Sequence, residues 1–151
     1  MADPKTVQYA DLESLVGETL APSDWFTVDQ DRINTFAEAT GDHQWIHVDV
    51  EKATAMFGST IAHGYLTLSL LPMFGPQVLR VEGVSRGINY GANKVRFTNF
   101  VPTGSKLRMV QTVKEVNAKA GGKQMISECT IEIEGMDKPA CVAETITVLY
   151  G

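Results

Sequence analysis

Residues 62–79, "AHGYLTLSLLPMFGPQVL", decide the fold of this chain. A helix built from this stretch carries apolar side chains on nearly every side, which is typical of a helix that is buried on most sides. Pro72 lies inside the stretch and is expected to bend the helix or to split off its last turns, because proline lacks the N–H that an interior turn requires. The helix is expected to begin near His63 and Gly64.

Strand patterning replaces helical patterning after Gly83. Two short strands are predicted in "SRGINYG" and "NKVRFT", and two longer ones flank "NAKAGG", which is a hairpin signal. A further strand, "ACVAETITVLY", closes the chain. In the second long strand, apolar side chains take one face and polar ones the other: Met125, Cys129, Ile131 and Ile133 against Glu128, Thr130, Glu132 and Glu134.

Helices that precede a run of antiparallel strands indicate the α+β class. A long antiparallel sheet must bury one of its faces, and the helix of residues 62–79 is expected to pack against that face. Strands wrapped around a buried helix describe the hotdog fold. A chain of 151 residues with 44% hydrophobic residues is expected to form a single domain over residues 1–151. The exposed edge and face of such a sheet predict a homodimer.

Charge and hydropathy exclude several classes of protein. The net charge of −5 gives no electrostatic support for binding nucleic acid. No apolar run is long enough to span a bilayer, so no membrane association is expected. The N-terminal stretch "MADPKTVQYADLES" lacks the apolar core of a signal peptide. A cytoplasmic location is therefore expected.

The two cysteines are expected to stay apart. If the last two strands form a hairpin that turns near Met136 and Asp137, Cys129 lies roughly opposite Glu144. Cys141 would then leave the sheet by the other face, because side chains alternate along a strand. A disulfide is not expected, which fits a reducing compartment.

A helix is predicted after "WFTVDQ". Thr27 and Gln30 have the spacing of a capping box, and Asp29 is an alternative cap. Gly41 is expected to end this helix. Asp49 is expected to cap a second, shorter helix.

The residues between these helices, 41–49, read "GDHQWIHVD". Asp42 and His47 can hold one water between them, with one group removing a proton and its partner returning one. Histidine suits this role because its pKa is near neutrality, at about 6.5. Trp45 and Ile46 could keep bulk water away. A structural alternative stays open, in which Asp42 caps a turn and His47 is a core histidine.

A metal site is not predicted here. His43 and His47 have the spacing of metal ligands only if the segment is helical. The preceding Gly-Asp indicates a loop, and no third ligand lies nearby in the sequence.

Two further features could bind a substrate. The first N–H groups of the helix near Gly64 have no internal partners, and a glycine lets a carbonyl oxygen approach closely. These are the parts of an oxyanion site, although the glycine could serve packing alone. Basic residues are locally dense and could hold an anionic small molecule, or they could be a solvated strand face: Lys94, Arg96, Lys106 and Arg108.

"FAEATGDHQWIHVD" followed by "IAHGYLTLSLL" resembles the MaoC-like, R-specific enoyl-CoA hydratases, and most of all their single-hotdog, nodulation-protein-N-like branch. The likeness extends through "NYGANKVRFTNFVPTGSKL" and covers most of the chain from about Val16 onward. It implies that Asp42 and His47 are catalytic and that the Gly64 N–H polarises a thioester carbonyl. Gln44 stands where the family has asparagine, and the family's proline is a tryptophan here, which puts the shape of the acyl pocket in doubt.

The resemblance implies R-specific hydration of trans-2-enoyl-CoA to R-3-hydroxyacyl-CoA, and the reverse dehydration, without a metal or redox cofactor. An acyl-CoA is the implied partner. Residues expected to contact it are Gln44, Trp45, His63, Lys94 and Arg96. Two alternatives remain: a hotdog acyl-CoA thioesterase, which attacks the carbonyl rather than Cβ, and a non-catalytic acyl-CoA binding module.

Overall fold

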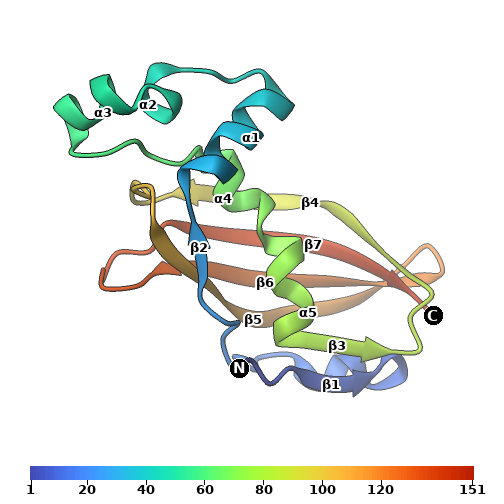
Figure 1. Ribbon diagram of the computed structural model, residues 1–151. Coiled ribbons are helices and arrows are strands. Elements are labelled where there is room, and N and C mark those ends of the chain that lie inside the picture. Colours follow the sequence, from blue (N-terminus) through green and yellow to red (C-terminus); the bar gives the residue numbers. More distant parts are fainter.

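The computed structural model describes residues 1–151. Its main feature is a five-stranded antiparallel sheet in the order β2-β5-β6-β7-β4 (Figure 1). The strands of this sheet are β2 (Phe26–Val28), β4 (Arg86–Phe97), β5 (Ser105–Lys119), β6 (Gly122–Ile133) and β7 (Cys141–Tyr150). A separate parallel pair consists of β1 (Lys5–Gln8) and β3 (Leu79–Glu82), and the 3-10 helix η1 (Tyr9–Leu15) follows β1.

Five α-helices complete the chain: α1 (Gln30–Thr40), α2 (Trp45–Val48), α3 (Val50–Phe57), α4 (Gly64–Ser69) and α5 (Leu71–Val78). Figure 1 shows α4 and α5 lying across one face of the sheet, while α1, α2 and α3 stand together beyond its upper margin. The predicted α+β hotdog arrangement is confirmed. We call α1, α2 and α3 the overhang; it includes residues 41–49, the segment with the candidate catalytic residues.

The central helix begins at Gly64, as predicted. It splits at Leu70, and Pro72 lies in the first turn of α5, where the missing N–H costs little. The prediction that the helix is buried on most sides is wrong for a single chain. Tyr65 is 70% exposed and Met73 is 36% exposed, because the sheet covers only one side of the helix. The buried side contributes Leu66, Leu70, Phe74 and Val78 to the core.

Strand β4 replaces the two short strands that the sequence predicted. It pairs with β7 throughout and has register shifts between Asn89 and Gly91 and between Ala92 and Lys94. Such irregularities bend a strand without ending its pairing, which explains the interrupted pattern in the sequence. The hairpin between β5 and β6 is confirmed, as is the apolar/polar alternation along β6.

The predicted placement of the cysteines is wrong by one residue. Cys129 lies opposite Ala143 rather than Glu144. A shift of one residue moves a side chain to the other face, so Cys129 and Cys141 both face the core. Both thiols are free and buried. Burial raises the pKa of Cys141 to about 11, which makes this thiol unreactive at neutral pH.

The helices of the overhang have the ends that the sequence indicates. Asp29 caps α1 by accepting a hydrogen bond from the Arg32 N–H at 2.9 Å, so the alternative cap holds and Gln30 does not form a capping box. Gly41 ends α1 with a φ of 83°, a left-handed conformation that glycine adopts without strain. Asp49 caps α3 in the same way as Asp29 caps α1.

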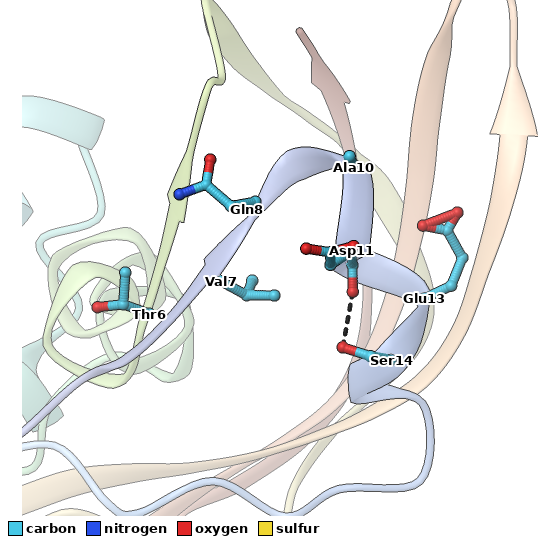
Figure 2. Close-up of a pocket in the computed structure, with 7 residues that line it drawn as sticks. All are labelled: Thr6, Val7, Gln8, Ala10, Asp11, Glu13 and Ser14. Carbon is cyan, nitrogen blue, oxygen red and sulfur yellow. Dashed lines mark hydrogen bonds between the residues drawn. The ribbon is translucent and has the colours of Figure 1, made fainter.

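None of the helices is both long and apolar enough to cross a bilayer. A pocket of about 770 Å³ lies along β1 and η1 (Figure 2). Its lining is largely polar, and its Glu13 already forms an ion pair with Lys123 at 2.6 Å. Figure 1 places β1 at the margin of the molecule opposite α1, α2 and α3, so this pocket is separate from the predicted site.

Candidate active site

Three predicted residues meet where the overhang reaches the start of α4. The ligand atoms of Asp42, His47 and His63 all lie within 4.8 Å of one another. Asp42 is exposed, whereas His47 is 6% exposed and His63 is 2% exposed. The cluster therefore combines one accessible carboxylate with two buried imidazoles.

The tautomer of His47 follows from its hydrogen bond. His47 Nδ1 lies 2.7 Å from the backbone oxygen of Ile61. A carbonyl oxygen only accepts, so Nδ1 carries the proton and Nε2 is left with a free lone pair. The same two segments are joined by the Ile61 N–H, which donates to the Ile46 carbonyl at 3.1 Å. His47 is thus oriented to take up a proton at Nε2.

His63 is arranged around His47 and Asp42. Its Nε2 donates to the backbone carbonyl of Asp42 at 3.0 Å, and its Nδ1 is buried without a partner. Its ring stacks on that of His47, with centroids 3.8 Å apart, and Phe36 packs against it at 4.8 Å. Burial lowers the pKa of His63, and the neighbouring His47 lowers it further. His63 is therefore neutral at neutral pH.

Asp42 owes its position to the end of α1. It follows the left-handed Gly41, and its Oδ1 accepts a hydrogen bond from the Gln44 N–H at 3.3 Å. The Gln44 side chain is exposed. It is therefore the backbone of Gln44, rather than its amide group, that orients the carboxylate.

Trp45 packs away from the cluster. Its ring stacks on Phe57 with centroids 6.0 Å apart, and the Lys52 Nζ lies 4.4 Å from its centroid. Both contacts are with α3. The tryptophan thus joins α2 to α3.

Gly64 is the first residue of α4, so its N–H has no partner within the helix. A Cβ built on Gly64 would lie 3.0 Å from Phe97 Cγ, which is too close without movement of the ring. A larger residue at this position would therefore need the Phe97 ring to shift. The close approach of Phe97 and the N–H without a helical partner are two separate properties of Gly64.

Lys94 and Arg96 are not brought to the cluster. Val95 packs against the core, and side chains alternate along β4, so its two neighbours point to the outer face of the sheet. Arg108 is occupied by an ion pair with Glu132 at 2.7 Å. A role for Lys94 and Arg96 in binding the nucleotide of CoA stays a prediction that rests on their charge.

Two imidazoles and a carboxylate are also ligand types for zinc. Here the rings of His47 and His63 are stacked at 22° to one another. A zinc ion in the plane of one ring would lie outside the plane of the other, where that ring has no lone pair. As they stand, the two rings do not direct in-plane lone pairs at one common ion.

Comparisons with known proteins identify the family of this chain. The MaoC-like domain matches residues 11–134. A 3-hydroxyacyl-thioester dehydratase Z of Mycobacterium tuberculosis is 52% identical over 91% of this chain and 92% of its own length. A nodulation protein N of Rhizobium leguminosarum is 42% identical over 93% of this chain and 89% of its own.

A solved structure, the unliganded R-hydratase of Pseudomonas aeruginosa, superposes with a TM-score of 0.73 at 26% identity. The match covers 94% of this chain and 84% of the hydratase chain. The fold of this chain is thus shared with that hydratase. A domain match over most of the length and relatives above 40% identity show that this chain belongs to the MaoC-like dehydratases.

Proposed function

We propose that this chain hydrates trans-2-enoyl-CoA to R-3-hydroxyacyl-CoA and catalyses the reverse dehydration. The observation that carries the proposal is the fixed tautomer of His47, whose free Nε2 lies in the same cluster as the Asp42 carboxylate. A carboxylate beside an imidazole with a free nitrogen can supply the base and the acid that the addition of water to a double bond needs. The name of the 52% identical relative supports the dehydratase chemistry, and the R-hydratase supports the stereochemistry.

The reaction needs a nucleophile at Cβ and a proton at Cα. Asp42 and His47 hold a water between them and remove one of its protons as its oxygen bonds to Cβ. The electrons of the double bond move toward the thioester oxygen, which becomes an enolate. The pair then returns a proton to Cα on the same face. The two groups act on one water, so neither is assigned alone as the base.

The Gly64 N–H stabilises the enolate oxygen in this proposal. It lies at the start of α4, next to His63, which touches both members of the pair. A donor aimed at developing negative charge stabilises the transition state more than the ground state. No metal or redox cofactor enters the reaction as proposed.

The direct test incubates the purified chain with a panel of trans-2-enoyl-CoA esters. We expect loss of the ultraviolet absorbance of the enoyl thioester without release of the CoA thiol, and a product of R configuration by chiral analysis. Release of the thiol would instead indicate a thioesterase. Tight binding with neither change would indicate a binding module.

We further propose that the chain works as a homodimer. Strand β4 is the edge of the sheet, and it leaves large apolar side chains in solvent, with Ile88 46%, Tyr90 55% and Phe97 45% exposed. A free edge with apolar side chains is suited to pairing with a second copy. Sedimentation equilibrium is expected to give twice the chain mass of 16.5 kDa. A species of single mass at micromolar concentration would contradict the dimer.

A further inference from the structure

Gln30, the first residue of α1, connects two segments of the site through its side chain. Its Nε2 donates to the backbone carbonyl of His47 at 2.8 Å. Its Oε1 accepts a hydrogen bond from the Thr60 hydroxyl. The second N–H of the same amide donates to Asn34 Oδ1 at 2.9 Å. One amide group therefore ties α2, which carries the histidine, to the segment that leads into α4.

The helical turn α2 depends on such contacts. It has only four residues, and a single turn is not stable in isolation. The carbonyl of His47 lies near the end of α2, where carbonyl groups have no partner within the helix. Gln30 supplies that partner from outside. The position of α2 is thus set by tertiary hydrogen bonds rather than by its own helix.

The other end of the connection is firmly held. Thr60 is 1% exposed, and its carbonyl accepts a hydrogen bond from the Thr103 N–H at 3.0 Å. The next residue but one, Ala62, donates to the Val101 carbonyl at 2.8 Å. This segment is therefore anchored to the chain that enters β5. Through its hydrogen bonds to Thr60 and His47, Gln30 fixes α2 to this anchored segment.

His47 is consequently linked by hydrogen bonds at two points, to Thr60 through Gln30 and to Ile61 directly. Its backbone carbonyl is linked through Gln30 to Thr60, and its ring Nδ1–H bonds to Ile61. Loss of the first link leaves the ring bond, with the neighbouring bond from the Ile61 N–H to the Ile46 carbonyl, to place Nε2. A displacement of about 1 Å at a reacting group costs on the order of 10² in rate.

We propose that Gln30, together with Thr60, is a positioning residue for His47. It places Nε2 relative to Asp42 and the bound substrate without touching either the substrate or the proton that moves. The inference rests on the proposed hydratase function. It predicts a loss of turnover that exceeds any loss of substrate binding.

The test begins with Gln30→Leu, which keeps the size of the side chain and removes its hydrogen bonds. We expect kcat to fall about 10- to 100-fold, with KM within about twofold of the parental value. Thr60→Val, which removes only the hydroxyl, should lower kcat less. Thr60→Ser restores the hydroxyl and should recover most of that loss. The double variant Gln30→Leu/Thr60→Val should be no worse than Gln30→Leu alone, because both changes break one connection.

Asn34→Ala is the matched control. It removes the other acceptor of the same amide and leaves the bond to His47 in place, so kcat should stay at the parental value. A folded Gln30→Leu variant with parental kcat would overturn the proposal. So would an equal loss in Asn34→Ala, which would assign the effect to the stability of α1, or a Thr60→Ser variant no better than Thr60→Val.

A second readout does not depend on activity. Proton NMR of the His47 Nδ1–H measures how fast this proton exchanges with water. Exchange should be faster in Gln30→Leu than in the parental chain and in Asn34→Ala. If the parental chain hydrates no enoyl-CoA while this difference is present, the proposed function fails and the positioning role stands. Equal exchange in all three proteins removes the positioning role, whatever the activity.

Discussion

Replacing either member of the acid–base pair is expected to lower turnover by roughly 10²–10⁴-fold. Asp42→Asn removes the charge of the carboxylate and keeps its shape. His47→Ala removes the imidazole whose Nε2 is left free by the hydrogen bond of Nδ1 to Ile61, whereas His63 already donates from its own Nε2 to the Asp42 carbonyl. Steady-state kinetics with a trans-2-enoyl-CoA, alongside thermal unfolding of each variant, measures the effect. The double variant should lose little beyond the worse single variant, since both residues act on one water.

His47 is also a buried packing residue, so its replacement needs a companion. His47→Asn places an amide N–H near the position of Nδ1, so it can still donate to the Ile61 carbonyl, but it cannot exchange a proton at neutral pH and should be as inactive as His47→Ala. His43→Ala is the matched control. His43 is exposed, and its partner is Glu38 at 2.7 Å, outside the cluster. Parental turnover in a folded Asp42→Asn or His47→Asn variant would remove that residue from the chemistry.

Gly64→Ala is expected to lower kcat/KM by roughly 10²–10³, the usual cost of losing one oxyanion donor. The added Cβ would crowd the approach of the thioester oxygen to the N–H or tilt the N–H away. It would also lie 3.0 Å from Phe97 Cγ, so a loss of thermal stability is expected as well. Two causes, lost oxyanion stabilisation and strained packing, are therefore mixed in this single variant.

The double variant Gly64→Ala/Phe97→Ala separates the two causes. Removing the ring gives the new Cβ room. The drop in melting temperature caused by Gly64→Ala should therefore be smaller in the Phe97→Ala background than in the parental chain. If the N–H binds the thioester oxygen, kcat/KM stays low in the double variant. If glycine serves packing alone, activity per folded molecule returns to that of Phe97→Ala, which would end the oxyanion role.

Features that depend on a few neighbouring residues could be predicted from the sequence. The caps at Asp29 and Asp49 and the left-handed end of α1 at Gly41 need only a short polar side chain or a glycine at the right position. The alternation along β6 and the hairpin that precedes it follow from the period of the strand. The start of the central helix at Gly64 and its break near Pro72 are equally local. The hotdog arrangement follows because one long apolar helix and one long sheet have few ways to cover each other.

Features that depend on how distant segments meet were decided by the tertiary structure. The pairing of Cys129 with Ala143 differs from the expected register by one residue, and local composition does not distinguish the two registers. The charges of Lys94 and Arg96 are visible in the sequence, but the bulges in β4 determine the face on which they lie.

The candidate site shows the same division. Asp42 and His47 lie close together in the sequence and could be paired from it. The stacking of His63 on His47 and the reach of Gln30 from α1 to both His47 and Thr60 could not be predicted. A hydrogen bond or a ring contact of this kind depends on ångström-scale placement of three separate segments. Only the packing of the overhang against the start of the central helix supplies that placement.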